Sequence, residues 1–125
     1  MTPTTHPLQG VVPVVPTPFT SDEAIDFNAL ADCVRFAADC GLSAVCLPAY
    51  ASEFYKLSDA ERREVVQAAI RAADGRMAVM AQANHPSSRL AAELARDYEA
   101  LGASIISFAL PRQFALKESD LLDYA

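Results

Sequence analysis

Apolar residues gather in short runs that alternate along the chain with segments of helical spacing. The first run, Val11–Val15, is rich in β-branched residues and is closed by Pro16. Three further short apolar runs lie at 44–47, 77–81 and 104–110. Runs of this length and composition are typical of strands that are buried on both faces of a sheet. The pattern therefore predicts four strands.

A segment whose apolar residues have helical spacing follows each predicted strand. The predicted helices span 26–41, 58–75, 90–102 and 118 to the end of the chain. The first and third end at a glycine, which supplies a left-handed stop. Ser58 and Glu61 form a capping box at the start of the second helix, and a loop at 84–88 supplies the cap of the third.

Strand and helix alternate four times at about the length of one βα unit, so the sheet is predicted to be parallel. A closed (β/α)8 barrel needs about 250 residues, whereas this chain has 125. Half a barrel and a four-stranded open sheet both fit this length. Because the last helix is cut off at Ala125, we favour an α/β fold made of the first four units of an incomplete TIM-type barrel. This partial barrel spans 10–125 and follows a lead-in at 1–9.

Composition narrows the function classes. The chain is 52% hydrophobic and 21% charged, with a formal net charge of -6, and it has no basic run that would bind a nucleic acid backbone. No apolar stretch reaches the roughly 18 residues of a membrane span, and the first ten residues lack the features of a signal peptide. We expect a cytoplasmic protein that binds neither nucleic acid nor membranes.

The three cysteines lie in apolar segments without the spacing of metal ligands. Cys33 and Cys40 are seven residues apart, so they share one face of the first predicted helix. With two histidines in the whole chain, a metal site is not expected. The cysteines are predicted to be reduced, buried thiols.

Several segments carry a resemblance to a known family. They are GVVPVVPTPF at 10–19, IDF at 25–27, Gly41, Glu53, Leu57-Ser58, Glu61-Arg62 and LGA at 101–103. In order and spacing they resemble the dihydrodipicolinate synthase and N-acetylneuraminate lyase family. The resemblance implies a β/α barrel, a lyase or aldolase activity on pyruvate or another 2-oxo acid, and a homo-oligomer, either a dimer or a tetramer. It implies no cofactor.

The resemblance also implies a Schiff-base lysine near the end of a later strand, beyond residue 125. The lysines of this chain are Lys56 and Lys117, on a predicted loop and at a predicted helix start. An exposed amine keeps its ordinary high pKa and is a poor Schiff-base nucleophile. We therefore expect the 125-residue chain to be inactive by itself.

The family motif G-T-T-G-E, which binds the substrate carboxylate, is matched here by Ala49-Tyr50-Ala51-Ser52-Glu53. Tyr50 takes the place of a threonine in the proton relay, and its phenol can pass a proton. The alternative is that Tyr50 fills the barrel mouth as an aromatic plug. Ala51 and Ser52 are predicted substrate-binding positions. Glu53 is the retained residue, and the resemblance implies a structural role in which it bonds backbone groups.

A second departure follows the fourth strand, where the family's Pro-Tyr-Tyr is matched by Pro111-Arg112-Gln113. The planar guanidinium of Arg112 suits a carboxylate, although an arginine paired at the rim or at an interface fits equally well. Thr17, Gln82 and Asn84 also follow strand ends and are predicted substrate-binding residues.

His85 lies in the loop after the third strand. It could act as an acid or base near neutral pH, but a loop histidine more often makes local hydrogen bonds. Two alternatives to an active enzyme also stay open. The chain could belong to a family member that has lost aldolase activity. It could instead be a half-barrel interaction module, since half a barrel exposes two sheet edges.

Overall fold

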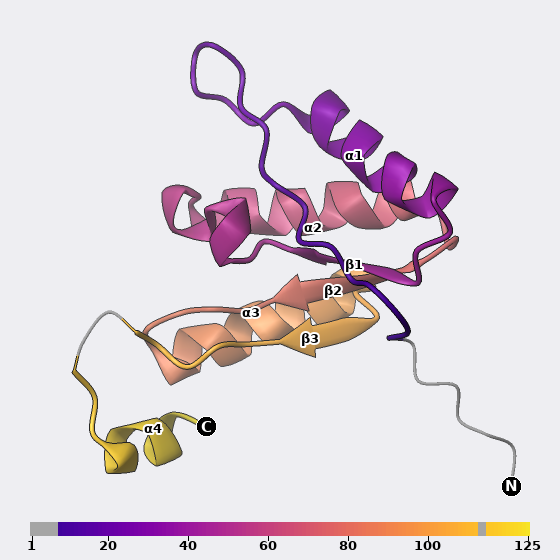
Figure 1. Ribbon diagram of the computed structural model, residues 1–125. Coiled ribbons are helices and arrows are strands. Elements are labelled where there is room, and N and C mark those ends of the chain that lie inside the picture. Colours follow the sequence, from indigo (N-terminus) through magenta and orange to yellow (C-terminus); the bar gives the residue numbers. More distant parts are fainter. Residues whose placement is uncertain (1–7, 113–114) are drawn as a thin grey trace, which may run out of the picture.

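Three parallel strands form the sheet of this protein. The computed structural model describes residues 8–112 and 115–125. The strands are β1 (Ala44–Leu47), β2 (Ala78–Gln82) and β3 (Ile105–Ser107), and they lie in the order β1-β2-β3. Each strand is therefore hydrogen-bonded to the next along the chain, as expected for consecutive βα units (Figure 1).

The predicted first strand is reduced to a single bridge beside β1. The Cys46 N–H donates to the Pro13 oxygen at 2.9 Å, and the Val15 N–H donates to the Cys46 oxygen at 3.0 Å. Val14 forms the isolated parallel bridge between these two bonds. The prediction of a strand over 11–15 was too long, because Pro13 and Pro16 have no N–H with which to continue a ladder.

The fourth predicted strand is also shorter than expected. Its pairing with β2 ends where Ser107 lies opposite Gln82, and β2 ends at that residue. Beyond Ser107 the chain has no neighbouring strand on either side within the described residues, so residues 108–110 leave the sheet although they are apolar.

The helices agree closely with the sequence pattern. They are α1 (Phe27–Asp39), α2 (Asp59–Ala73), α3 (Ser88–Leu101) and α4 (Glu118–Tyr124), with the short 3-10 turns η1 (Tyr50–Ser52) and η2 (Phe54–Lys56) between β1 and α2. The capping box of α2 is present as predicted. α1 packs on α2, and α2 packs on α3, while α4 lies at the end of the long connection that follows β3 (Figure 1).

One face of the sheet carries the core. Val45, Leu47 and Val79 pack with α1 and α2 in one apolar cluster, and Ala81 packs with α3 in a second cluster that Ile106 borders. Because side chains alternate along a strand, the intervening residues point to the opposite face. These are Cys46, Met80, Gln82, Ile105 and Ser107.

Burial on both faces, which the apolar runs predicted, is complete in β1. In β2 every second residue is half-buried, and all of β3 is half-buried. These two strands are apolar enough for a closed interior, but the face turned away from the helices is partly open to solvent in this structure. The reason is that no described helix or strand covers this face of β2 and β3.

The cysteines follow the prediction in part. All three thiols are free, and Cys46 is buried while Cys33 is half-buried. Burial raises the pKa of the Cys46 thiol. The prediction was wrong for Cys40, which is exposed. The reason is that α1 ends at Asp39, so Cys40 is the C-cap beyond the packed part of the helix.

Candidate functional site

The predicted site residues gather at the carboxyl ends of the parallel strands. Tyr50, Ala51 and Ser52 form η1 just after β1, Gln82 ends β2, and Arg112 follows β3 by a few residues. In parallel α/β folds, the carboxyl ends of the strands are where ligands bind. The fold therefore brings these residues to one side of the molecule.

Two buried hydroxyls hold the η1 turn. The Thr17 hydroxyl donates to the Ser52 backbone oxygen at 2.7 Å, and the Ser52 hydroxyl donates to the Val15 oxygen at 2.5 Å. Ser52 is fully buried, and Thr17 is 8% exposed. Each hydroxyl has one proton to donate, and here both protons are used within the protein. Donation from Ser52 to a substrate carboxylate would require breaking the bond to Val15.

Tyr50 stands at the edge of a small hollow. Its ring meets the Phe54 ring edge-on, with centroids 5.0 Å apart, and 39% of the residue is exposed. The hollow is lined by Tyr50, Phe54, Asn84, His85, Pro86, Ala109 and Pro111. Tyr50 is thus partly exposed where the connections after β1, β2 and β3 meet, and the hollow itself has no room for a water molecule. Both roles predicted for Tyr50, proton relay and aromatic plug, are compatible with this position.

Asn84 ties the end of β2 to the segment after β3. Its amide donates to the Gln82 side-chain oxygen at 2.8 Å, and its own side-chain oxygen accepts from the Ala109 N–H at 2.6 Å. Asn84 is 2% exposed. Gln82 is half-buried on the face of the sheet turned away from the apolar clusters. Asn84 therefore fixes the side chain of Gln82 as well as the backbone around Ala109.

Ser107, which no motif in the sequence singles out, lies directly opposite Gln82 in the β2–β3 pairing. Its hydroxyl is buried and has no hydrogen-bond partner among the described residues. The alternation of β3 contains the signal, because Ile106 belongs to the helix-facing side and its neighbours must face the other way. Gln82 and Ser107 together form a polar pair at the carboxyl end of that face.

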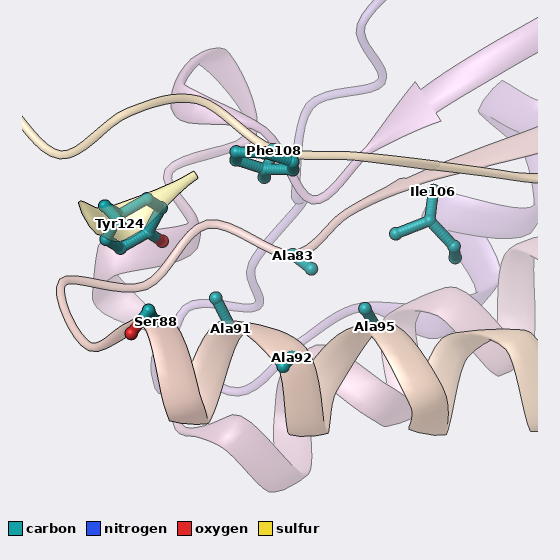
Figure 2. A pocket seen from close by; sticks show the side chains of 8 residues that line it. All are labelled: Ala83, Ser88, Ala91, Ala92, Ala95, Ile106, Phe108 and Tyr124. Atoms are coloured by element: carbon teal, nitrogen blue, oxygen red, sulfur yellow. The ribbon is translucent and has the colours of Figure 1, made fainter. Parts of the chain in front are cut away.

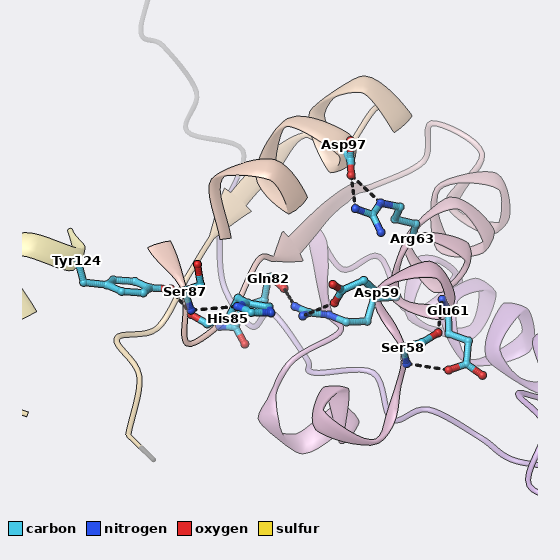
Figure 3. A network of polar contacts seen from close by, with 10 residues as sticks. Ser58, Asp59, Glu61, Arg63, Gln82, His85, Ser87, Asp97 and Tyr124 are labelled. Atoms are coloured by element: carbon cyan, nitrogen blue, oxygen red, sulfur yellow. Dashed lines mark hydrogen bonds and ion pairs between the residues drawn. The ribbon is translucent and has the colours of Figure 1, made fainter. Parts of the chain in front are cut away.

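His85 makes local hydrogen bonds. Its Nδ1 accepts from the Ser87 N–H at 3.0 Å, and its backbone oxygen accepts from the Tyr124 hydroxyl at 2.5 Å. Figure 3 shows Tyr124 reaching across from α4 to this loop. An acceptor Nδ1 places the proton of the neutral ring on Nε2. Burial raises the pKa of Tyr124, and the nearby Tyr50 adds to this rise.

Glu53 shapes the loop through its backbone. It adopts a left-handed conformation, with φ 58°, between η1 and η2, and its N–H donates to the Tyr50 oxygen at 2.9 Å. Its carboxylate pairs with the Lys56 amine at 3.0 Å. The predicted bonds from this carboxylate to backbone groups are not among the hydrogen bonds of the described residues.

Both lysines lie where the sequence predicted. Lys56 is exposed in η2, and the hydrogen bond to Glu53 raises the pKa of its amine. Lys117 is exposed at the start of α4. An amine that is held protonated is a weak nucleophile. Neither lysine has the environment of a Schiff-base residue.

A buried arginine escaped the sequence analysis. Arg62 is 2% exposed, and its guanidinium lies 4.9 Å from the centre of the Phe54 ring. Its Nη2 donates to the Gln82 backbone oxygen at 3.3 Å. The signal was its spacing, because Arg62 falls in line with the buried positions 65, 66 and 69 of α2. In the sequence, Arg62 stands out only as part of the Glu61-Arg62 pair of the family resemblance.

Arg112 and Ala51 are both exposed. Arg112 has no ion-pair partner among the described residues, whereas Pro111 beside it lines the hollow. Gln113, the third residue of the matched Pro-Tyr-Tyr position, lies outside the described residues. Arg112 is therefore free to meet an anion, but the structure does not aim it at a particular group.

A second, apolar pocket lies on the face of the sheet that packs against α3 (Figure 2). It is lined by Ala83, Ser88, Ala91, Ala92, Ala95, Ile106, Phe108 and Tyr124 and encloses about 170 Å³. Typical small-molecule pockets start at about 300 Å³ and include polar groups that orient the ligand. This pocket is therefore a packing gap between the sheet, α3 and α4.

The described residues also contain no group of three or more His, Cys, Asp or Glu side chains that could hold a metal.

The sequence profile of the Dihydrodipicolinate synthetase family matches residues 7–125. The chain belongs to this family. An uncharacterized DapA-like lyase of Halobacterium salinarum is 33% identical over 109 residues, which are 87% of this chain and 36% of that protein. A 4-hydroxy-tetrahydrodipicolinate synthase of Ruthia magnifica is 31% identical over 106 residues, 85% of this chain and 36% of that protein.

Solved structures of the dihydrodipicolinate synthetase family share the fold. The crystal structure of dihydrodipicolinate synthase from Aquifex aeolicus superposes with a TM-score of 0.88 at 24% identity, over 94% of this chain and 40% of that chain. The predicted resemblance is thereby confirmed, as is an α/β fold with parallel strands. The chain spans little more than a third of the length of the curated relatives that it matches, and the sheet of its described residues has three strands.

No helix within the described residues is long and apolar enough to cross a membrane.

Proposed function

We propose that this chain is the N-terminal part of a lyase or aldolase-type enzyme that acts on pyruvate or another 2-oxo acid through a Schiff base. Membership of the dihydrodipicolinate synthetase family supports lyase chemistry. The observation that carries the proposal is the gathering of Tyr50, Gln82, Asn84 and Ser107 at the carboxyl ends of the strands. In β/α barrels this is the end at which the reaction takes place.

In this proposal the chain supplies the binding side of the site. Arg112 binds the carboxylate of the 2-oxo acid, since a planar guanidinium matches two carboxylate oxygens. The exposed turn at Ala51 lies beside the substrate. Thr17 and Ser52 hold that turn through their buried hydrogen bonds, and Glu53 shapes it through its left-handed backbone. Gln82 and Asn84 offer amide groups that bind the oxygens of the substrate.

Tyr50 moves a proton in the proposed mechanism. A lysine amine adds to the carbonyl carbon of the 2-oxo acid, and the carbonyl oxygen then leaves as water. On balance, the two protons of that water come from the amine nitrogen. A hydroxyl that is near both atoms speeds this transfer. Tyr50 is 39% exposed and lines the hollow, so we assign its phenol this relay. The amine itself comes from a lysine beyond residue 125.

The proposal includes the rest of the protein. Residues 10–125 are the first four βα units of a TIM-type barrel, after a lead-in at 1–9, and the complete enzyme is a cytoplasmic dimer or tetramer. It uses no cofactor or metal and binds no nucleic acid. The partly open face of β2 and β3 supports this part of the proposal, because further barrel units would close that face.

Borohydride trapping with pyruvate tests the proposal. The experiment compares a longer gene product that continues past Ala125 with its Tyr50→Phe variant, and Tyr55→Phe serves as the matched control because Tyr55 is exposed on the same loop. We expect a covalent adduct in the wild type, trapping about 100-fold slower in Tyr50→Phe, and no change in Tyr55→Phe. A gene that ends at Ala125, or a longer protein that traps no pyruvate, contradicts the proposal. It would then favour an inactive family member or an interaction module.

A further inference from the structure

Arg62 is a buried cation in an unfavourable place. It lies in the first turn of α2, which begins at Asp59, and 2% of it is exposed. A helix dipole disfavours positive charge near its N-terminus, and removing a guanidinium from water carries a further penalty. Its Nε is buried without a hydrogen-bond partner among the described residues. Only contacts made by the rest of the guanidinium can offset these penalties.

The contacts that bear on the candidate site come from three elements, and the buried Tyr98 of α3 also lies beside the guanidinium. Nη1 lies 3.6 Å from the Asp59 carboxylate of α2. Nη2 donates to the backbone oxygen of Gln82 at the end of β2. The guanidinium also lies over the ring of Phe54 in η2, at 4.9 Å, a cation–π distance. Arg62 thus joins the connection after β1 to the end of β2.

Two of these contacts, to Phe54 and to Gln82, lead to walls of the candidate site. Phe54 holds the ring of Tyr50 edge-on at 5.0 Å. Gln82 holds Asn84 through their 2.8 Å side-chain bond. Tyr50 and Asn84 both line the hollow. Arg62 does not line the hollow itself. It is linked to Tyr50 through Phe54 and to Asn84 through Gln82.

We propose that Arg62 is a positioning residue that fixes Tyr50 relative to Gln82 and Asn84. Its effect on catalysis rests on the function proposed above, but its effect on the position of Tyr50 does not. The shape of arginine matters here, because its planar fork presents two nitrogens to two different partners while its face covers a ring. A lysine is a single charge and can meet either the Gln82 oxygen or the Phe54 ring.

Arg63 offers a matched control on the same helix. Its guanidinium pairs with Asp97 of α3, with Nε at 2.6 Å and Nη2 at 2.5 Å from the same carboxylate oxygen. Figure 3 shows this pair on the side of α2 that faces α3, away from His85 and Gln82. Arg63→Met removes a neighbouring guanidinium and a bond between two helices. Among the described residues its bonded partner is Asp97, which does not line the hollow.

The first readout needs no activity. Nitration of Tyr50 relative to Tyr55, followed by peptide mass spectrometry, reports how far the Tyr50 ring is held against Phe54. We expect the Tyr50 to Tyr55 ratio to rise about twofold in Arg62→Met, because loss of a contact opens the structure locally, and to stay unchanged in Arg63→Met. Equal ratios in the two variants would overturn the proposal even if both proteins are active.

The second readout uses the longer protein and its pyruvate trapping. In Arg62→Met we expect the trapping rate at saturating pyruvate to fall about 100-fold, as for a group displaced by about 1 Å, with a smaller change in the pyruvate concentration at half-maximal rate. Arg62→Lys should keep the fold and recover part of the rate. If Arg62→Met fails to fold, Arg62→Lys decides, since wild-type values in both readouts contradict a positioning role. Absence of trapping in the wild type counts against the proposed function alone, because the nitration ratio still tests the position of Tyr50.

Discussion

The Thr17 hydroxyl donates a 2.7 Å hydrogen bond to the backbone oxygen of Ser52, thirty-five positions along the chain. The Ser52 hydroxyl in turn donates a hydrogen bond to the backbone oxygen of Val15. Together the two bonds fasten the turn that carries Tyr50 to the segment that pairs with β1. Because this segment pairs with β1 through a single bridge, the two side-chain bonds hold the turn in place. The hydroxyls of Thr17 and Ser52 are therefore already used within the protein before any ligand binds.

Replacing Ser52 with alanine should destabilise the protein. The change removes a buried hydrogen bond and leaves the Val15 oxygen without that donor, so we expect a loss of about 1–2 kcal/mol in the free energy of unfolding. Urea unfolding followed by circular dichroism measures it. Ser119→Ala, at an exposed position of α4, should stay within about 0.5 kcal/mol of the wild type. A Ser52→Ala protein as stable as this control would show that the hydroxyl does not hold the turn.

Alkaline pH should destabilise the fold through buried acids. Burial raises the pKa of Tyr98, more than the nearby Arg62 lowers it, and burial also raises that of Cys46. A raised pKa favours the folded state below the pKa of the unfolded chain, and this contribution is lost as pH rises further. We therefore expect the free energy of unfolding to fall above about pH 9 to 10.

The variant Tyr98→Phe separates the two groups. It removes the phenol, so its stability should decline less steeply than that of the wild type above about pH 10. Tyr55→Phe, at an exposed position, should follow the wild-type curve. The measurement is urea unfolding at a series of pH values. A wild-type slope in Tyr98→Phe would mean that this tyrosine does not contribute to the alkaline loss.

Arg112 should affect binding without affecting stability. It is exposed and has no ion-pair partner among the described residues, so Arg112→Gln breaks no ion pair within that part of the chain. In the longer protein we expect the pyruvate concentration at half-maximal trapping to rise about tenfold, since a hydrogen bond to a charged group contributes about 1.5 kcal/mol or more. Arg96→Gln, exposed on α3, is the matched control. Equal pyruvate dependence in the two variants would place Arg112 at a rim or interface instead.

Local signals in the sequence predicted the helices well. The capping box of Ser58 and Glu61 and the left-handed Gly102 act within a few residues of the helix ends that they define. Strand ends were harder to predict, because pairing depends on the neighbouring strand. The segment at 11–15 is apolar enough for a strand, yet its prolines reduce it to one bridge. The number of hydrogen bonds that this segment makes to β1 can be seen only in the structure.

The candidate site was predicted in position more than in contacts. Family resemblance and strand ends placed Tyr50, Gln82 and Asn84 near one another. The sequence could not show that the Ser52 hydroxyl points inward to the Val15 oxygen, since that depends on how the turn packs. Arg62 and Ser107 were missed because each looks ordinary in sequence, and their importance comes from burial beside Gln82.

The position of the pyruvate adduct shows whether the Schiff-base lysine lies beyond residue 125. The 125-residue chain and the longer protein are each reduced with borohydride in the presence of pyruvate, digested, and analysed by peptide mass spectrometry. We predict no adduct on the chain alone and a single modified lysine beyond residue 125 in the longer protein, with Lys56 and Lys117 unmodified in both. An adduct on Lys56 or Lys117, or no adduct in the longer protein, would contradict this prediction.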